Sequence, residues 1–211
     1  MAELTTTSYA ILGLLNIRPW SAYELTQQAK RSLRYAWPKS ESHLYAEPKR
    51  LVRLGLAQVS EAPAGPVRTR QVYRITAAGR RALRRWLESE PASPQLEFEA
   101  VLRLFYADAT DKDTVLAMLA HTHDDIEQRY TEGRALVEAW LGDEAPFPER
   151  LHISALVAVF TRDLLALMLR WSEFAQREIE QWPRTDGLGM TPRTRELLQR
   201  LLDEEPVIEE D

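Results

Sequence analysis

The side chains best suited to metal or acid–base chemistry form one short run, His121-Thr122-His123-Asp124-Asp125. Residues two positions apart point to different sides of a helix, whereas helical zinc sites use the i and i+4 spacing. We therefore expect that His121 and His123 do not share a metal ion. The sequence also has no cysteine, no Gly-rich phosphate loop and no nucleophile elbow. We expect no metal, no cofactor and no catalytic activity; an enzyme would have to show turnover that disappears on substitution of His121 or His123.

A second group of polar residues surrounds the expected start of a helix near residue 40. Backbone amides and short hydroxyls at a helix start can bind phosphate, and longer side chains there can reach base edges. This pattern predicts contacts to DNA. The alternative interpretation is an ordinary solvated helix face capped by a serine. The candidate DNA contacts in this segment are Ser40, Ser42, His43, Tyr45, Lys49 and Arg50.

Arginines follow this segment in two places. Arg68 and Arg70 alternate with apolar residues in an expected strand and are the best candidates for contacts to the DNA backbone, with Arg74 expected nearer the core. Arg80, Arg81, Arg84 and Arg85 form a denser run on the next helix. A solvated helix face is the favoured interpretation of that run, and contact to DNA or a link to a second domain is the alternative.

Charge divides the chain into two parts. The whole sequence of 211 residues has a net charge of −5, but residues 1–88 carry 15 basic and 6 acidic side chains, a net +9. The remaining residues carry 12 basic and 26 acidic side chains, a net −14. Such a split predicts a basic domain that approaches a polyanion and an acidic domain that stays away from it. Chance clustering of charge on solvated faces is the alternative.

The elements of the basic part follow from caps, periodicity and turn residues. A helix over 5–17 stops at Arg18-Pro19, a second begins at the Ser21/Glu24 capping box and runs to about 32, and a third runs from about 40 or 42 to Gly55. Leu44, Leu51 and Leu54 are expected in the core. Two strands, 56–60 and 67–75, then flank a Pro- and Gly-containing turn, and Thr76 caps a helix to about 88. Three helices followed by a hairpin is the winged-helix order, in which the third helix enters a major groove.

Four segments in this order resemble the PadR family of transcription regulators: YAILGLL, SAYEL, LYAEPKRLVRLGLA and YRITAAGRRALRRWL. The resemblance is specific over residues 5–88 and looser over 95–182, where FEAVLRLFYAD and the long helices resemble the family's dimerisation domain. It implies a dimeric repressor of inverted-repeat operators, often released by small molecules or stress, and a DNA contact for Tyr45. Pro48 departs from the family, which usually has an aliphatic residue there. The third helix should therefore either start close to Tyr45 or bend at Pro48.

The second half reads as all helix. Long segments are expected from Thr110 to about 140, from about 149 to 182 and from Thr191-Pro192 to about 205. Two helices of about thirty residues cannot bury broad apolar stripes against each other alone, which predicts a partner surface, most simply a second copy. Aromatic residues of this half either line a pocket for a small apolar effector or belong to the core. The four that we assign to this pocket or core are Phe105, Trp140, Phe160 and Trp171.

Together these patterns predict a mainly α protein: an amino-terminal winged helix-turn-helix with a β-hairpin wing, and a carboxy-terminal helical dimerisation domain. The expected domains are 1–88 and 95–205, followed by an acidic tail, 206–211. The expected partners are double-stranded DNA bound at a pseudo-palindromic site, a second copy and a small apolar effector. We find no signal peptide and expect no membrane-spanning stretch, so the cytoplasm is the expected location. The rival hypothesis is a winged-helix module that binds another protein instead of DNA.

Overall fold

The computed structural model of the chain describes residues 4–33, 41–63 and 69–203. The chain folds as two compact units, residues 1–94 and 95–211. We describe each unit by itself.

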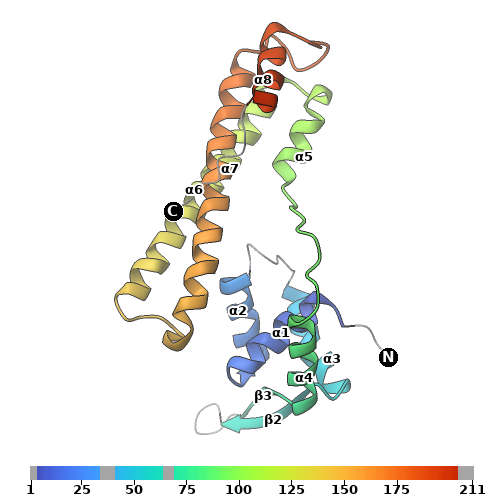
Figure 1. The fold of residues 1–211 in the computed structure, drawn as a ribbon, viewed down its shortest axis with the longest axis vertical. Helices are drawn as coiled ribbons and strands as arrows, with labels where there is room; N and C mark the ends of the chain where they lie inside the picture. Colours follow the sequence, from blue (N-terminus) through green and yellow to red (C-terminus); the bar gives the residue numbers. More distant parts are fainter. Residues whose placement is uncertain (1–3, 34–40, 64–68, 204–211) are drawn as a thin grey trace. The chain divides into compact units, whose positions relative to one another are not determined.

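Unit 1 contains helices and a small sheet in the order that the sequence predicted (Figure 1). Its fold is a winged helix, because a three-helix arrangement precedes an antiparallel hairpin and a fourth helix follows it. The elements are α1 (Thr6–Ile17), β1 (Trp20–Ser21), α2 (Ala22–Leu33), α3 (Glu41–Arg53), β2 (Ala57–Pro63), β3 (Thr69–Ile75) and α4 (Ala77–Leu87).

Short polar side chains fix the starts of three helices in this unit. Ser21 and Glu24 form the predicted capping box, with Ser21 N donating to Glu24 Oε2 at 2.8 Å and Glu24 N donating to Ser21 Oγ at 3.2 Å. Thr76 accepts a hydrogen bond from Gly79 N, as predicted. A second capping box, between Thr5 and Ser8, begins α1 and was not predicted. Each cap satisfies backbone donors that the first turn of a helix leaves unpaired.

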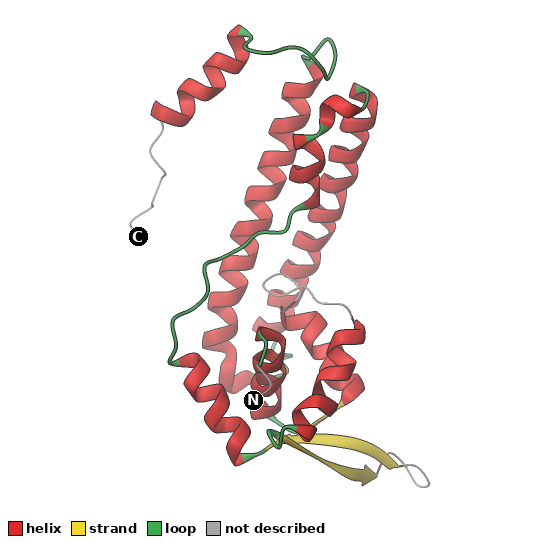
Figure 2. Cartoon of the chain, turned by 90° about the vertical axis from the view of Figure 1, so that its right-hand side faces the viewer, coloured by secondary structure: helices red, strands yellow, loops and turns green. Residues whose placement is uncertain are grey.

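The sheet has three antiparallel strands in the order β1-β3-β2. Figure 2 shows β2 and β3 side by side as a two-stranded hairpin, in which Ala57 pairs with Ile75 and Pro63 with Thr69. The prediction that the first strand ends at residue 60 was wrong, because pairing with β3 continues to Pro63. The prediction that Arg74 lies nearer the core was also wrong, since its side chain is exposed.

The core of unit 1 forms where α1 packs against α2, α3 and α4. Ile11, Leu12, Leu25 and Leu51 are completely buried. Leu54, which we expected in this core, is 36 % exposed because it follows the last residue of α3, just before the turn at Gly55. The third helix is therefore anchored by its inward leucines Leu44 and Leu51.

Close packing between the hairpin and α4 requires a glycine at position 79. A Cβ atom there would lie 2.1 Å from the backbone oxygen of Leu56 and 2.8 Å from a side-chain carbon of Ile75. Thr76 N also donates to the same Leu56 oxygen, at 3.1 Å. The absence of a side chain at Gly79 thus lets α4 begin directly against the base of the hairpin.

Unit 2 is all helical over its described residues. It consists of α5 (Glu99–Phe105), a 3-10 turn η1 (Ala107–Ala109), α6 (Lys112–Leu141), a second turn η2 (Pro148–Arg150), α7 (Leu151–Glu180) and α8 (Pro192–Asp203). The expected start of α6 at Thr110 was wrong by one residue, because the side chain of Asp111 is the cap that accepts from Thr114 N. The short helix α5 was not predicted as an element.

The two long helices lie side by side as a hairpin, packed at one end and open at the other (Figures 1 and 2). At the packed end, Val115 and Leu119 of α6 and Ala175 and Ile179 of α7 form a buried cluster. At the other end several large apolar side chains remain exposed. They include Leu136, Val137, Leu141, Ile153, Leu156, Val157, Val159 and Phe160.

Our expectation that no stretch is long and apolar enough to span a bilayer was wrong. Residues Pro148–Glu180 include an 18-residue window of mean hydropathy 1.6, of which only 6 % is buried within the chain. Length and composition alone carry this finding, and a single helix of this kind is weak evidence for a membrane span. What it establishes is that α7 has an extensive apolar surface that its own chain leaves uncovered.

Candidate nucleic-acid interface

Helix α3 leaves polar side chains exposed and buries leucines. His43, Tyr45 and Lys49 are exposed, whereas Leu44 and Leu51 are buried. Tyr45 and Lys49 are four residues apart and therefore share a face that is free for a ligand, whereas His43 points to a different side of the helix. The leucines fix the helix in the domain. Of the remaining candidates in this segment, Ser40 and the side chain of Ser42 lie outside the described residues.

Pro48 lies inside α3 and is completely buried. The helix begins at Glu41, so the expectation that it starts close to Tyr45 was wrong. Proline has no N–H, which leaves the carbonyl of Leu44 without the usual helical donor. Pro48 thus interrupts one helical hydrogen bond and, at the same position, contributes an apolar side chain to the core.

Arg50 has surroundings that differ from those of the exposed candidates. Its Nη1 lies 2.8 Å from Glu47 Oε1 and 3.0 Å from the Oγ of Ser8 on α1. The side chain of Arg50 is 27 % exposed and that of Glu47 only 12 %. Spacing along the sequence could not reveal this arrangement, because Ser8 precedes Arg50 by 42 residues.

Arg70 connects the wing to the start of α2. Its Nη1 lies 3.2 Å from Glu24 Oε1, and Arg18 Nη1 lies 4.0 Å from the same oxygen. The side chain of Arg70 remains 50 % exposed, so its guanidinium can also reach a ligand outside the domain. Arg68, the other wing candidate, lies outside the described residues.

Arg70 and Arg18 both contact Glu24, and the ionisation of the Glu24 carboxyl group should affect the stability of the fold. The backbone hydrogen bond from Ser21 is the main cause that holds the pKa of Glu24 below its ordinary value of 4.5, with help from Arg70 and Arg18. A carboxyl group whose pKa is lowered by folding stabilises the fold above its unfolded pKa, and this contribution disappears as the pH falls through the folded pKa.

Replacing Glu24 by Gln should therefore lower the free energy of unfolding at neutral pH by up to about 1 kcal/mol. The loss should shrink at a second, acidic pH below the lowered pKa of Glu24, where the wild-type carboxyl group is also protonated. Denaturant unfolding of the wild type and the variant at the two pH values measures this loss of unfolding free energy. Glu61→Gln, on the exposed part of the wing, is the control, and an equal effect at both positions would contradict the prediction.

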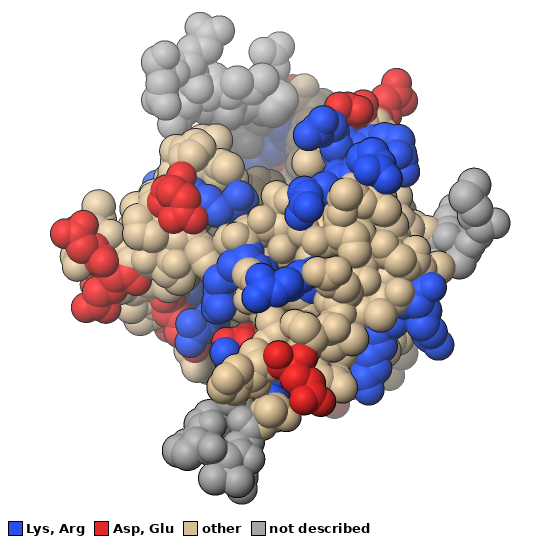
Figure 3. Space-filling view, turned by 90° about the horizontal axis from the view of Figure 1, so that it is seen from below, with Lys and Arg blue, Asp and Glu red and all other residues tan. Residues whose placement is uncertain are grey.

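Further positive charge lies on α4, where Arg80, Arg81, Arg84 and Arg85 are all exposed. Arg80 also donates to the backbone oxygen of Ile75 at 3.4 Å. The space-filling view in Figure 3 shows Lys and Arg in several separate groups, with uncharged surface between them. The positive charge of unit 1 is therefore distributed over several elements.

The fold and this surface define a winged-helix domain, and comparison with known proteins gives its family. Residues 11–85 match the Transcriptional regulator PadR-like family. The match lies within the winged-helix unit, which is therefore similar to the PadR-like family, as the sequence motifs indicated. The Negative transcriptional regulator PadR of Bacillus subtilis (strain 168) is 29 % identical over 99 residues, which are 46 % of this chain. That match spans about half of the relative, 54 % of its length.

Solved structures are similar over a larger part of the chain. Bacillus subtilis PadR in complex with operator DNA has a TM-score of 0.68 at 20 % identity, covering 83 % of this chain and 99 % of that one. A PadR-like transcriptional regulator from Bacillus cereus has a TM-score of 0.67 at 14 % identity, covering 82 % and 98 %. Bacillus subtilis PadR in complex with p-coumaric acid has a TM-score of 0.62 at 19 % identity, covering 84 % and 100 %. At these identities the likeness establishes the fold, which continues from the winged helix into the helical unit.

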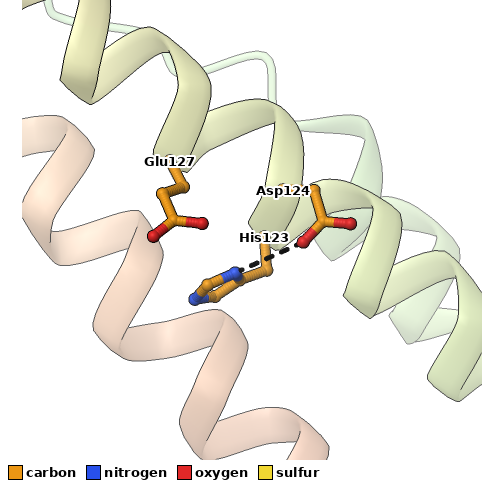
Figure 4. A group of neighbouring side chains, drawn as sticks. All are labelled: His123, Asp124 and Glu127. Atoms are coloured by element: carbon orange, nitrogen blue, oxygen red, sulfur yellow. Dashed lines mark ion pairs between the residues drawn. The ribbon is translucent and has the colours of Figure 1, made fainter.

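The histidine run on α6 contributes a contact between the two long helices. His123 Nε2 lies 3.3 Å from Glu173 Oε1 on α7, and His123 Nδ1 lies 3.8 Å from Asp124 Oδ1. Together with Glu127, His123 and Asp124 place one ligand atom each within 4.8 Å of one another (Figure 4). His121 is not part of this group. Because both carboxylates are exposed and Arg177 lies 3.8 Å from Glu173, we interpret the group as a polar network in which His123 and Glu173 join α6 and α7.

The four aromatic residues assigned to an effector pocket or a core have different surroundings. Trp171 packs against the buried cluster and contacts Phe98 edge-on, with ring centroids 5.4 Å apart. Phe105 and Phe160 are 78 % and 59 % exposed. The buried Nε1 of Trp140 has no hydrogen-bond partner among the described residues.

Proposed function

We propose that this protein is a transcription regulator that binds a pseudo-palindromic DNA site as a homodimer. The observation that carries the proposal is the exposed face of α3 with Tyr45 and Lys49, together with the exposed His43, on a helix that Leu44 and Leu51 hold in the core. In the winged-helix class the third helix of the domain enters the major groove. The wing would add Arg68 and Arg70 as contacts to the DNA backbone.

The uncovered apolar surface of unit 2 supports the homodimer. Leu156 and Phe160 lie one helical turn apart on α7 and are 75 % and 59 % exposed. Exposed apolar patches of this kind usually mark an interface. A two-fold pair of chains would bring two copies of α3 to two half-sites about one DNA turn apart. We therefore assign residues 95–205 to dimerisation and residues 1–88 to DNA binding.

Repression, effector control and location complete the proposal. The Bacillus subtilis relative is named a negative regulator, which supports repression. The Bacillus subtilis protein has been solved with p-coumaric acid. We propose that a small, largely apolar molecule binds the aromatic residues of unit 2 in this chain, and that its binding releases the DNA. We place the protein in the cytoplasm, with a second copy rather than lipid covering α7.

The test is the affinity of the purified protein for two short duplexes, its own upstream region and a scrambled control, at two salt concentrations. We expect tight and salt-sensitive binding to the upstream duplex, with two protomers per duplex and at least about a thousandfold preference over the control. Weak binding that is equal on both duplexes would instead favour a module that binds another protein. Full affinity for a single asymmetric half-site would contradict the two-fold arrangement.

A further inference from the structure

A buried polar network joins the recognition helix α3 to the first helix of the domain. Ser8 Oγ on α1 donates to Glu47 Oε1 on α3 at 2.6 Å. Arg50 Nη1 donates to the same carboxylate oxygen at 2.8 Å and to Ser8 Oγ at 3.0 Å. Three polar groups from two helices thus meet at one point inside unit 1.

The Ser8 hydroxyl uses its entire hydrogen-bonding capacity in this network. A hydroxyl has one donor and two acceptor sites. Ser8 gives its proton to Glu47 and accepts from Arg50 Nη1 and from the backbone N–H of Thr5, the latter at 3.0 Å. Ser8 is completely buried, so water cannot replace any of these bonds.

Glu47 and Arg50 compensate each other's charge. Glu47 as a whole residue is only 9 % exposed, and a buried carboxylate without a partner is strongly unfavourable. Arg50 is three residues further along the helix, so its guanidinium reaches Glu47 across one turn. Ser8 is the member of this network that lies on α1, and it contacts both Glu47 and Arg50. The network therefore ties this side of α3 to α1.

We propose that Ser8, Glu47 and Arg50 are positioning residues, which set the orientation in which α3 presents Tyr45 and Lys49 to DNA. This inference rests on the proposed DNA-binding function. It gives Arg50 a role other than the direct DNA contact that its place in the sequence indicated. Tyr45 and Lys49 read or hold the DNA, while the Arg50 guanidinium stays with Glu47.

A double-mutant cycle on DNA affinity separates positioning from contact. The variants are Glu47→Met, Arg50→Met and the double variant, each measured on the upstream and scrambled duplexes at two salt concentrations. Positioning predicts that each single change lowers the preference for the upstream duplex about tenfold, and that the double change lowers it no further, because residues in one network are not additive. The salt dependence should stay unchanged. Direct contact predicts that Arg50→Met costs the same affinity with and without Glu47 and lowers the salt slope by about one.

Ser8 provides a second test that does not alter charge. Ser8→Ala should reduce the preference for the upstream duplex although Ser8 is completely buried and cannot touch DNA. Thr5→Ala is the control, because it removes the Oγ1 that caps Ser8 N and lies 3.2 Å from Ser8 Oγ, but leaves the bonds of Ser8 Oγ to Glu47 and Arg50 in place. Circular dichroism and thermal unfolding establish that each variant is folded.

The outcomes distinguish this inference from the proposed function. Equal loss of preference in Thr5→Ala and Ser8→Ala, or additive effects of Glu47→Met and Arg50→Met, would overturn the positioning role. Both results leave DNA binding by the wild type intact. Failure of the wild type to prefer its upstream duplex would instead remove the proposed function itself.

Discussion

A variant that combines Tyr45→Ala, Lys49→Ala and Arg70→Ala should bind the upstream duplex at least about 100-fold more weakly than the wild type. The three side chains come from the recognition helix and the wing, and all are exposed. Removing a phosphate-binding cation should weaken binding to every sequence and reduce the salt slope by about one for each cation. Removing a base contact should reduce the preference for the upstream duplex.

Electrophoretic or fluorescence titration at two salt concentrations measures these effects. The control variant is Arg103→Ala with Arg134→Ala, which removes the same positive charge from exposed positions on unit 2. We expect the control to bind nearly as the wild type does. Both variants should remain dimeric. If the triple variant bound DNA normally but lost a protein partner, the interaction module would be the better explanation.

Local chemistry made much of the winged-helix unit predictable. The Ser21/Glu24 capping box and the Thr76 cap lie where the sequence placed them, because a cap joins residues only three positions apart. The two-residue strand β1 was missed because it exists only through pairing of Trp20 with Tyr73, far along the chain. Arg74 and Leu54 were placed too deep for a similar reason, since burial depends on which elements cover a residue.

The candidate site shows the same limit. His43, Tyr45 and Lys49 are exposed on the expected helix because the spacing of Leu44 and Leu51 fixes its inward face. Arg50 has the same type and spacing as a DNA contact, and only the tertiary fold brings Ser8 beside it. Residue type therefore predicted which segment is polar, while the partner of each side chain had to come from the structure.

The sequence pattern predicted the apolar surface of α7. The pattern alone did not distinguish a protein partner from lipid on that surface. Its leucines and valines recur at helical spacing, which predicted a helix with a broad apolar stripe. The same composition gives the stretch the mean hydropathy of a membrane span. Arg162 and Asp163 lie in the middle of the helix, and charges at such a depth are expensive in lipid. A protein partner explains both the stripe and these charges.

Replacing Leu156 and Phe160 by Glu should dissociate the homodimer, raising its dissociation constant at least about 1,000-fold. Two residues one turn apart on α7 would each bring a carboxylate into the interface, where an unpaired charge is strongly unfavourable. The monomer should stay folded, because both side chains are already exposed within the chain. Loss of the dimer should also weaken binding to the two-fold DNA site, since each monomer would then bind one half-site alone.

Sedimentation equilibrium over a range of concentrations measures the dissociation constant, and circular dichroism reports whether the helices persist. Arg134→Glu is the control, because Arg134 is 71 % exposed on α6. This substitution makes the helical hairpin more negative by the same amount as the double variant does. We expect it to remain a dimer. A double variant that stays dimeric would show that another surface joins the copies, and the exposed leucines Leu198, Leu201 and Leu202 of α8 would then be the next to replace. A wild type that is monomeric in solution but floats with lipid vesicles would assign the α7 surface to a membrane instead.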